Sequence, residues 1–343
     1  MTTRIGINGF GRIGRAVYRV LRQRQLAGAA PAVELVAVND VVDPVQLAPL
    51  LELDSISGRL GERVDATDGS LVIGGETLRV LSYPEPAAIP WRDYGVEVVI
   101  ESTRFFTAAK DAAGHLEGGA RLVIVSAPSD GADATFVGGV NDDTFEPTRH
   151  RVVSNASCTT NCLAPMVKVL DEAFGIEQAL MTTVHAYTSE QNLVDLPQRD
   201  PRRARAAAVN VVPTSTGAAR AIGLVVGSVA GRLDGSALRV PVADGSIIDL
   251  TALLHVEVTA DEISGAFRAA ADAAPLAGVL AWSDRPIVSS DIIGRPEACI
   301  FDAPLTIAQG RMAKVFGWYD NEWGYTNRLV DLTERLGTAN LRQ

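Results

Sequence analysis

The chain has 343 residues and a net charge of −10, and 47% of its residues are hydrophobic. This length predicts two domains, each with its own hydrophobic core. The negative charge argues against nucleic-acid and anionic-membrane partners, and no apolar run reaches membrane-spanning length. The three cysteines are not spaced as a disulfide framework and no signal-peptide pattern is present, so we expect a cytoplasmic protein.

The first half of the chain alternates short apolar strands with amphipathic helices. We expect strands at residues 4–8, 33–38, 96–100, 122–125 and 151–153, helices at 13–23 and 108–116, and a hairpin at 71–80. Continuous apolar strands that alternate with helices are typical of a parallel sheet covered on both faces. Residues 1–157 therefore predict an α/β domain with a Rossmann-type, doubly wound sheet.

The pattern changes after residue 157. A helix is expected at 158–174, followed by long alternating runs at 178–187, 237–241, 247–258 and 312–318 and by helices at 217–229 and 261–274. These segments predict an α+β domain at 158–324 with a mixed or antiparallel sheet. A final helical segment within 325–343 is expected to pack back on the first domain. The polar stretch 188–211 is too long for an ordinary connector, which favours a functional loop.

A glycine-rich turn joins the first expected strand to the first helix. Gly9, Gly11 and Gly14 form the pattern G-x-G-x-x-G, which lets a pyrophosphate sit on the helix N-terminus. Asp40 ends the second strand, where a carboxylate accepts hydrogen bonds from an adenosine ribose and repels a 2′-phosphate. The arrangement predicts NAD rather than NADP as cofactor; the alternative is a turn that only connects strand and helix.

Cys158 stands at the start of the helix expected at 158–174. A helix N-terminus lowers the pKa of a thiol, so this position favours a reactive thiolate over a structural cysteine. His185 ends a strand and has the pKa that a base for a thiol nucleophile needs. Cys158, Cys162 and His185 make a poor metal site because they lack a fourth ligand, so no metal is expected.

Several groups are candidates for binding an anion. Thr216 and Gly217 open the helix expected at 217–229, and Arg239 lies within an apolar strand, where a half-buried guanidinium needs a partner. Arg203 belongs to a group of arginines in the loop 188–211. For any one of these loop arginines the alternative is a solvated or intersubunit charge.

Five segments together resemble the phosphorylating glyceraldehyde-3-phosphate dehydrogenases, and the resemblance covers essentially the whole chain. The segments are Ile7–Gly14, Ser154–Pro165, Thr183–Thr188, Pro213–Ala219 and Trp318–Tyr325. The resemblance implies an enzyme that converts D-glyceraldehyde 3-phosphate, NAD and inorganic phosphate into 1,3-bisphosphoglycerate in glycolysis and gluconeogenesis. It also implies an NAD-binding first domain, a catalytic second domain and a homotetramer in which the loop 188–211 packs against a neighbouring subunit.

The resemblance implies roles for individual residues. Cys158 is the nucleophile, which forms a hemithioacetal and then a thioester, and His185 activates it. The substrate phosphate and inorganic phosphate are bound by Ser157, Thr159, Thr188, Arg203, Thr216, Gly217 and Arg239. NAD contacts Arg12, Ile13, Asp40, Ser126 and Asn321, the last of which holds the nicotinamide carboxamide. Leu196 and Pro197 match loop residues that accompany NAD preference.

Three positions depart from the family pattern. Arg104 replaces a glycine at which the backbone approaches the cofactor, Pro84 replaces an arginine near the adenine end, and Val242-Ala243-Asp244 replaces a Thr-x-Asn sequence. These departures suggest a specialised paralogue, such as one that tolerates a thiol-directed inhibitor. Two alternatives stay open: an erythrose-4-phosphate dehydrogenase, and a catalytically weak relative with a regulatory role.

Overall fold

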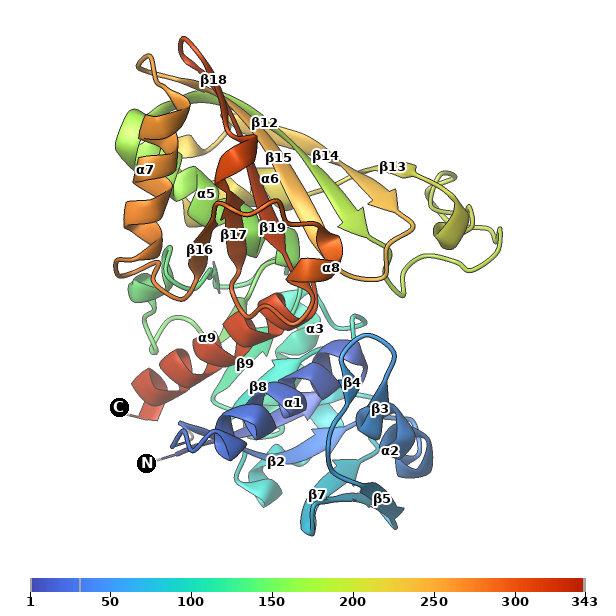
Figure 1. Cartoon of the computed structure of the whole chain (residues 1–343). Coiled ribbons are helices and arrows are strands. Elements are labelled where there is room, and N and C mark those ends of the chain that lie inside the picture. Colours follow the sequence, from blue (N-terminus) through green and yellow to red (C-terminus); the bar gives the residue numbers. More distant parts are fainter. Residues whose placement is uncertain (1, 31, 342–343) are drawn as a thin grey trace. The chain divides into compact units, whose positions relative to one another are not determined.

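The computed structural model describes residues 2–30 and 32–341, and the chain divides into two compact units (Figure 1). Unit 1 contains Met1–Phe136, Thr144–Ala156 and Leu329–Gln343, and unit 2 contains Val137–Asp143 and Ser157–Arg328. We expected residues 137–143 in the first domain, but they group with unit 2. The reason is visible at Gly139, where an added Cβ would lie 2.7 Å from the carbonyl oxygen of Pro275 in the same unit.

Unit 1 is built on a nine-stranded sheet in the order β10-β11-β9-β8-β1-β2-β7-β6-β5. The strands are β1 (Thr3–Asn8), β2 (Val33–Asn39), β5 (Val64–Thr67), β6 (Ser70–Ile73), β7 (Glu76–Leu81), β8 (Val98–Glu101), β9 (Leu122–Val125), β10 (Ala134–Thr135) and β11 (Val152–Ser154). Neighbours from β10 to β7 are parallel, and β5 and β6 add an antiparallel edge. The predicted Rossmann-type sheet is confirmed.

The order of the strands marks a ligand-binding edge in unit 1. The central strand β1 has β2 on one side and β8 on the other, so the direction of the crossover connections reverses there. In open α/β sheets, ligands bind beyond the carboxyl ends of the strands at this switch point. The glycine-rich turn that begins at Gly9 follows β1 directly and therefore lies at that edge.

The helices of unit 1 are α1 (Arg12–Leu26), α2 (Pro44–Glu52), α3 (Ala109–Ala112), α4 (Gly114–Glu117) and the C-terminal part of α9 (Trp323–Leu341). Arg24 near the end of α1 donates to Asp331 at 2.7 Å and to Glu334 at 3.1 Å, which ties α1 to α9. The single helix expected at 108–116 is instead two short helices that meet at Ala113. A small antiparallel pair, β3 (Leu53–Asp54) and β4 (Gly58–Arg59), lies outside the main sheet.

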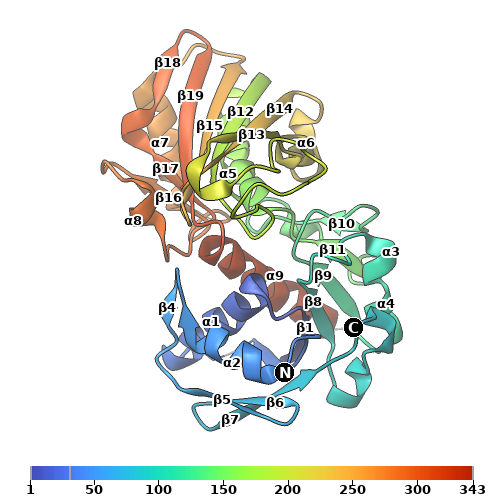
Figure 2. The ribbon, with the colours of Figure 1, turned by 90° about the vertical axis from the view of Figure 1, so that its right-hand side faces the viewer.

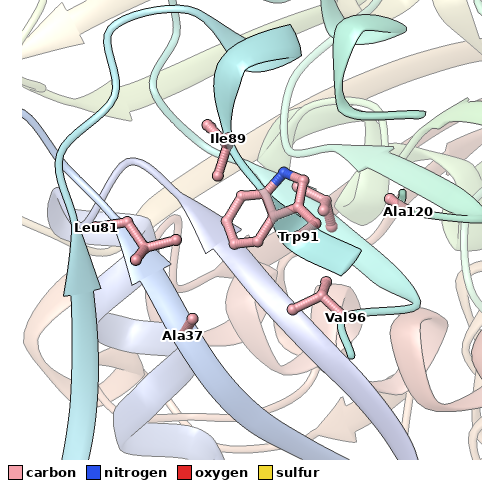
Figure 3. Packing of buried hydrophobic residues seen from close by; sticks show 7 residues of the cluster. Ala37, Leu81, Ile89, Trp91, Val96 and Ala120 are labelled. Carbon is pink, nitrogen blue, oxygen red and sulfur yellow. The ribbon is translucent and has the colours of Figure 1, made fainter. Parts of the chain in front are cut away.

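The core of unit 1 includes a cluster around Trp91 (Figure 3). The Trp91 side chain is fully buried among Ala37, Leu81, Ile89, Val96, Val99 and Ala120. A Cβ at Gly6 in β1 would lie 2.6 Å from the Trp91 ring, so glycine is what allows the ring to lie against this strand. Truncation of a buried Trp costs about 3–5 kcal/mol, so this cluster is a main source of stability for the sheet.

Unit 2 is built on an eight-stranded mixed sheet in the order β13-β14-β12-β15-β19-β17-β16, with β18 paired to β19 (Figure 2). The strands are β12 (Ile176–Ala186), β13 (Val212–Ser215), β14 (Leu233–Val240), β15 (Ser246–Leu254), β16 (Leu280–Ser283), β17 (Cys299–Asp302), β18 (Ile307–Gln309) and β19 (Met312–Tyr319). β12 pairs with β14 in parallel and with β15 in antiparallel orientation. The predicted mixed sheet is confirmed.

The helices of unit 2 are α5 (Cys158–Phe174), α6 (Ala218–Val225), α7 (Ala260–Ala271) and α8 (Ser289–Ile292). α5 packs on several strands and also contacts α6 and α7, so these three helices form one layer on the sheet. The loop 188–211 contains only one short 3-10 turn, Ala207–Val209. Within the described ranges, no helix is both long and apolar enough to cross a membrane.

Candidate active site

The start of α5 is shaped by a capped and tightly turned backbone. Ala156 has a φ of 55°, a left-handed conformation that non-glycine residues rarely adopt, and it turns the chain sharply before the helix. The Ser157 hydroxyl then accepts a hydrogen bond from the Thr160 N–H at 3.0 Å and caps the helix. Cys158 is consequently the first residue of α5, where backbone N–H groups are free of intrahelical partners.

Cys158 and His185 are brought into contact by α5 and β12. The Sγ atom of Cys158 lies 3.4 Å from Nε2 of His185, which is the second-last residue of β12 and only 4% exposed. The Tyr319 ring packs edge-on against the imidazole, with ring centroids 5.8 Å apart. The two residues predicted to form a nucleophile and base pair therefore have the separation that such a pair needs.

Two groups contact the other ring nitrogen of His185. Nδ1 lies 2.6 Å from the Ala186 carbonyl oxygen and 2.8 Å from Nη1 of Arg239, which pairs with His185 across β12 and β14. If Nδ1 carries a hydrogen, it donates to the Ala186 carbonyl oxygen. If Nδ1 carries a lone pair instead, it accepts a hydrogen bond from Arg239. The Nδ1–H tautomer leaves the lone pair of Nε2 facing Sγ, which is the form that a base requires.

Burial opposes the thiolate that we expected at Cys158. Desolvation raises the pKa of the Cys158 thiol, although Arg239 and hydrogen bonds from Thr159 act in the opposite direction. Desolvation and then Arg239 lower the pKa of His185 to about 3. Both shifts favour the uncharged forms of the two side chains in the free chain. The sequence showed the helix N-terminus, which lowers the pKa of the thiol. It could not show the burial of Cys158, which raises that pKa and arises only in the folded unit.

Arg239 has free hydrogen-bonding capacity beside this pair. Its Nη1 donates to the Ala186 carbonyl oxygen at 3.0 Å, while its Nε is buried and makes no hydrogen bond with the described residues. The hydroxyl of Thr188, two residues beyond β12, is also buried without a partner in the described chain. Buried donors without partners are unfavourable, so these two groups suit a bound anion.

The other predicted anion-binding residues differ in their contacts. Arg203 donates from Nε to Thr214 at 2.9 Å and forms an ion pair with Glu190 at 3.1 Å, and its charge also lowers the pKa of His185. Thr216 and Gly217 precede α6 and, in the described part of the chain, make no hydrogen bond to the Cys158–His185 pair. An added Cβ at Gly217 would meet nothing within 4 Å, so the start of α6 is open.

Tyr319 is a site residue that the sequence did not reveal. Its hydroxyl lies 2.9 Å from the Thr159 hydroxyl and 2.8 Å from that of Thr183, and the Tyr319 side chain is buried. The hydroxyl of Thr159, which we expected to bind phosphate, is therefore engaged with Tyr319. The contact joins α5, β12 and β19, and residues so distant in the chain leave no local signal.

Asn321 follows β19 and is 6% exposed. Its Oδ1 accepts a hydrogen bond from the Ser246 hydroxyl at 2.7 Å, and the same Ser246 oxygen accepts from the Ala186 N–H at 3.0 Å. Asn321 is thus held in unit 2 through Ser246, which leaves its orientation well defined for recognition of an amide.

In unit 1 the glycine-rich turn is tightly packed on its inner side and open on its outer side. Gly9 has a φ of 91°, and a Cβ there would lie 2.6 Å from the Thr103 nitrogen; a Cβ at Gly14 would lie 2.3 Å from the Gly9 carbonyl oxygen. At Gly11, in contrast, an added Cβ meets nothing within 4 Å, so the outer side of the turn is open. The first-turn N–H groups of α1, at Arg12, Ile13 and Gly14, lie next to this open side.

Asp40 lies at the end of β2 beside the same turn. Its carboxylate accepts hydrogen bonds from the N–H groups of Phe10 at 2.7 Å and Val42 at 2.9 Å. The Arg12 guanidinium forms an ion pair with Asp54 at 3.1 Å. The group of Arg12 that faces the open side of the turn is therefore its backbone N–H. Ser126 directly follows β9 at the carboxyl edge of the sheet. These residues fit a dinucleotide with an adenosine ribose at Asp40 and phosphates at the turn.

Arg104 has a left-handed backbone conformation of the kind that favours glycine. Its φ is 70°, and its side chain is exposed. The neighbouring Ser102 hydroxyl donates to the Gly9 carbonyl oxygen at 2.7 Å, so this loop packs on the glycine-rich turn. The backbone at Arg104 is therefore strained where this loop meets the glycine-rich turn.

Comparisons with known proteins agree with this geometry. Residues 3–109 match the family model for the glyceraldehyde 3-phosphate dehydrogenase NAD binding domain, and residues 157–321 match the model for the C-terminal domain of the same enzymes. The chain is 53% identical to glyceraldehyde-3-phosphate dehydrogenase 2 of Streptomyces arenae over 99% of this chain and 100% of that protein. It is 56% identical to glyceraldehyde-3-phosphate dehydrogenase of Mycobacterium tuberculosis, again over 99% and 100% of the two chains.

A third relative, glyceraldehyde-3-phosphate dehydrogenase of Streptomyces coelicolor, is 54% identical over 98% of this chain and 99% of its own length. The similarity extends over both units. The chain belongs to the glyceraldehyde-3-phosphate dehydrogenase family.

Proposed function

We propose that this chain is an NAD-dependent glyceraldehyde-3-phosphate dehydrogenase that converts D-glyceraldehyde 3-phosphate and inorganic phosphate into 1,3-bisphosphoglycerate. The observation that carries the proposal is the 3.4 Å contact between Cys158 Sγ and His185 Nε2 at the start of α5. Unit 1 supplies the NAD-binding domain and unit 2 the catalytic domain.

The first step is the addition of the Cys158 thiol to the aldehyde. As the Sγ–C bond forms, the thiol proton passes to Nε2 of His185, and the carbonyl electron pair moves onto the oxygen. Nε2 can accept this proton because it lies 3.4 Å from Sγ and carries a lone pair in the Nδ1–H tautomer. The protonated Nε2 and the first-turn N–H groups of α5 are the donors available to stabilise the new oxyanion.

Oxidation of the hemithioacetal leaves a thioester on Cys158. NAD, when bound, supplies the acceptor for the hydride, an oxidising chemistry that no side chain can provide. A phosphate oxygen then attacks the thioester carbonyl and the C–Sγ bond breaks. The sulfur recovers its proton from His185, and the proton of the phosphate is released to solvent, so the enzyme returns to its resting state.

The two phosphates would be held by donors on several elements of unit 2. Arg239 and Thr188 contribute buried donors that lack partners in the described chain. The other groups proposed to bind phosphate are Ser157, Thr159, Arg203, Thr216 and Gly217. The Thr159 hydroxyl, 2.9 Å from that of Tyr319, could accept from Tyr319 and donate its own hydrogen to the anion.

The cofactor would be held by the turn and strand ends of unit 1. Gly9, Gly11 and Gly14 shape the turn, and the N–H groups of Arg12 and Ile13 face the pyrophosphate. Asp40 would bind the ribose, Ser126 would line the edge of the sheet, and Asn321 of unit 2 would bind the nicotinamide carboxamide. Asp40 disfavours a 2′-phosphate, which supports NAD over NADP.

We also propose a homotetramer that works in the cytoplasm. Supporting the assembly, the loop 188–211 exposes apolar side chains that a monomer would leave in water: Leu193 is 85% exposed, Val194 64%, and Val209 76%. Light scattering coupled to gel filtration tests this assembly.

An assay of NADH formation, followed by the absorbance of NADH, tests the proposed function. The purified chain is assayed with glyceraldehyde 3-phosphate or erythrose 4-phosphate in phosphate buffer. The proposal expects much the higher kcat/KM with the triose phosphate. A preference for the tetrose phosphate would indicate an erythrose-4-phosphate dehydrogenase, and no reduction with either aldehyde would indicate a catalytically silent relative.

A further inference from the structure

Polar groups from three residues converge on a buried carboxylate at the end of β8. Glu101, the last residue of this strand, is 2% exposed. Its Oε2 accepts a hydrogen bond from the Asn8 side chain at 2.6 Å and lies 3.0 Å from Nε2 of His115. Its Oε1 accepts from the Thr103 N–H at 2.7 Å and from the Thr103 hydroxyl at 2.5 Å.

Trp91 fixes the direction of the contact between His115 and Glu101. The indole N–H of Trp91, which can only donate, lies 3.0 Å from Nδ1 of His115. Nδ1 therefore carries a lone pair, the hydrogen of the buried ring lies on Nε2, and Nε2 donates to Glu101. The Glu101 carboxylate thus accepts four hydrogen bonds and is an anchor built into the core of unit 1.

Glu101 restrains the 102–105 segment that follows it. Thr103 donates to the carboxylate twice, and the Thr103 hydroxyl also accepts a hydrogen bond from the Phe105 N–H at 3.1 Å. Arg104, between these two residues, has the left-handed φ of 70°. A non-glycine residue persists in such a conformation only where its surroundings over-determine it. The hydrogen bonds of Thr103 provide this restraint on both sides of Arg104.

The same segment lies against the glycine-rich turn. The Ser102 N–H donates to the Asn8 carbonyl oxygen at 2.8 Å. An added Cβ at Gly9 would lie 2.6 Å from the Thr103 nitrogen, which is the atom that donates to Glu101. The Gly9 carbonyl oxygen in turn lies against Gly14 in the first turn of α1. A displacement of the Thr103 nitrogen therefore reaches the start of α1 through Gly9.

We propose that Glu101 is a positioning residue for NAD that acts through Thr103 and keeps the strained 102–105 segment against the glycine-rich turn. The inference rests on the proposed function, because the pyrophosphate is assigned there to this turn. Without the anchor, the backbone at Arg104 relaxes toward a negative φ and Thr103 moves away from Gly9. The first-turn N–H groups of α1 then lose their fixed arrangement, and NAD affinity falls.

Two replacements of Thr103 test the anchor in the full-length chain. Thr103→Val removes the hydroxyl with its hydrogen bonds to Glu101 and Phe105 and nearly conserves the volume of the side chain, whereas Thr103→Ser keeps the hydroxyl. Isothermal titration with NAD should give a dissociation constant about fivefold or more above the wild-type value for Thr103→Val. The value for Thr103→Ser should stay within twofold of the wild type. Equal values for Thr103→Val and the wild type would overturn the inference.

A second substitution at Arg104 distinguishes positioning from a general loss of stability. Glycine adopts a φ of 70° without strain, so it removes the need for the anchor. We expect Thr103→Val combined with Arg104→Gly to bind NAD within twofold of Arg104→Gly alone. Thr103→Val combined with Arg104→Ala retains the Cβ and should bind about fivefold or more weakly than Arg104→Ala alone. The same loss of affinity in the glycine and alanine backgrounds would show that strain at Arg104 has no part in it.

Glu101→Gln tests the carboxylate itself. The substitution turns one of the two acceptor oxygens into an NH2 group, which would face either the Thr103 N–H or the Nε2–H of His115, so the NAD dissociation constant should again rise about fivefold or more. Glu97→Gln is the matched control and should bind NAD like the wild type. Glu97 lies just before the other end of β8, where it accepts from the Arg4 N–H at 3.2 Å. A similar loss in both variants would reduce the effect to one of charge.

Limited digestion with trypsin needs no ligand and is independent of the proposed function. Trypsin cleaves after arginine, and the Arg104 side chain is exposed, so the initial rate of cleavage after Arg104 reports release of the 102–105 segment. This rate should rise about fivefold or more in Thr103→Val and Glu101→Gln but not in Thr103→Ser. Cleavage after Arg63, whose side chain is 82% exposed, should not change.

Two outcomes of the digestion would overturn the inference. Equal increases after Arg104 and Arg63 would show a general loss of stability, and no increase after Arg104 would show that the anchor does not restrain the segment. If Glu101→Gln does not fold, the two Thr103 variants still decide. A chain that shows the expected digestion and NAD affinities but does not oxidise glyceraldehyde 3-phosphate would contradict the proposed function alone.

Discussion

Nη1 of Arg239 lies 2.8 Å from Nδ1 of His185, and the two residues are paired across neighbouring strands of the unit 2 sheet. This contact gives Arg239 two effects on the site. Its charge contributes to the low pKa of His185, and its buried Nε remains available to an anion. One guanidinium thus favours the neutral imidazole and, in the proposed mechanism, would attract a phosphate.

Replacement of Arg239 by Gln should separate these two effects. Loss of a charge-assisted hydrogen bond costs about 1.5–3 kcal/mol, so the KM for phosphate or for the phosphorylated substrate should rise roughly 10–100-fold. Without the cation, the folded-state pKa of His185 rises, so the acidic limb of the kcat profile should move to higher pH. The exposed Arg63, which pairs with Asp65, provides the control Arg63→Gln. An unchanged KM in Arg239→Gln would remove Arg239 from the phosphate sites.

The two cysteines of α5 should behave differently when replaced by Ser. Cys158→Ser should abolish aldehyde oxidation, because a hydroxyl is a much weaker nucleophile than a thiol. Cys162 is fully buried, with its sulfur 3.6 Å from the Gly317 carbonyl oxygen, and Cys162→Ser should keep most of the activity. Steady-state kinetics and NAD titration check both variants, and an inactive Cys162→Ser with an active Cys158→Ser would reverse the assignment.

His185→Asn should retain NAD binding but lose the base. General base catalysis contributes about 10²–10⁴-fold, so the rate of acylation should fall by a factor in this range. Rapid mixing of the enzyme, NAD and aldehyde measures this rate directly. Acylation at the wild-type rate would show that the thiol reacts without help from the imidazole.

The preference for NAD should depend on Asp40. We expect at least about tenfold preference over NADP, because an unpaired like-charge contact with the 2′-phosphate costs roughly 1–3 kcal/mol. Asp40→Ala should reduce the preference for NAD over NADP. Asp40→Asn removes the charge but retains an oxygen for the Phe10 N–H, which lies 2.7 Å from the Asp40 carboxylate in the wild type. Comparison of kcat/KM for both cofactors checks the prediction. A wild type that uses the two cofactors equally well would contradict it.

Arg104 should store backbone strain next to the cofactor turn. A non-glycine residue at a φ of 70° costs about 1 kcal/mol or more, so Arg104→Gly should raise the free energy of unfolding by about that amount. We also expect a several-fold change in NAD affinity or in inactivation by thiol-directed reagents. Arg104→Ala removes the charge but keeps the Cβ, so it separates the two causes. Agreement of both variants with the wild type within twofold in every measurement would show that the substitution is neutral.

Local signals in the sequence predicted most of the framework. The alternation in β12 and β19, the apolar run in β9 and the helix that starts at Cys158 all appear within a residue or two of the expected bounds. α2 was missed, although Asp43 followed by Pro44 is a helix-start signal and the Asp43 side chain accepts from the Val45 N–H at 2.8 Å. Short strands such as β10, with two residues, carry too little pattern to be detected.

The parts of the site that the sequence could not reveal depend on contacts between distant segments. Tyr319 joins Thr159 and Thr183 through its hydroxyl, and only the packing of α5 on the sheet brings the three together. The charge state of Cys158 depends on burial, which opposes the visible effect of the helix N-terminus.

The most direct test of the account is the time course of NADH formation when the enzyme and NAD are mixed rapidly with glyceraldehyde 3-phosphate in the absence of phosphate. The central claim is that a thioester on Cys158 waits for phosphate as its acceptor. The account predicts a burst equal to the concentration of Cys158 sites, a stop, and steady turnover once phosphate or arsenate is added. Sustained NADH formation at the same rate without either anion would contradict it and would indicate a hydrolytic, non-phosphorylating enzyme.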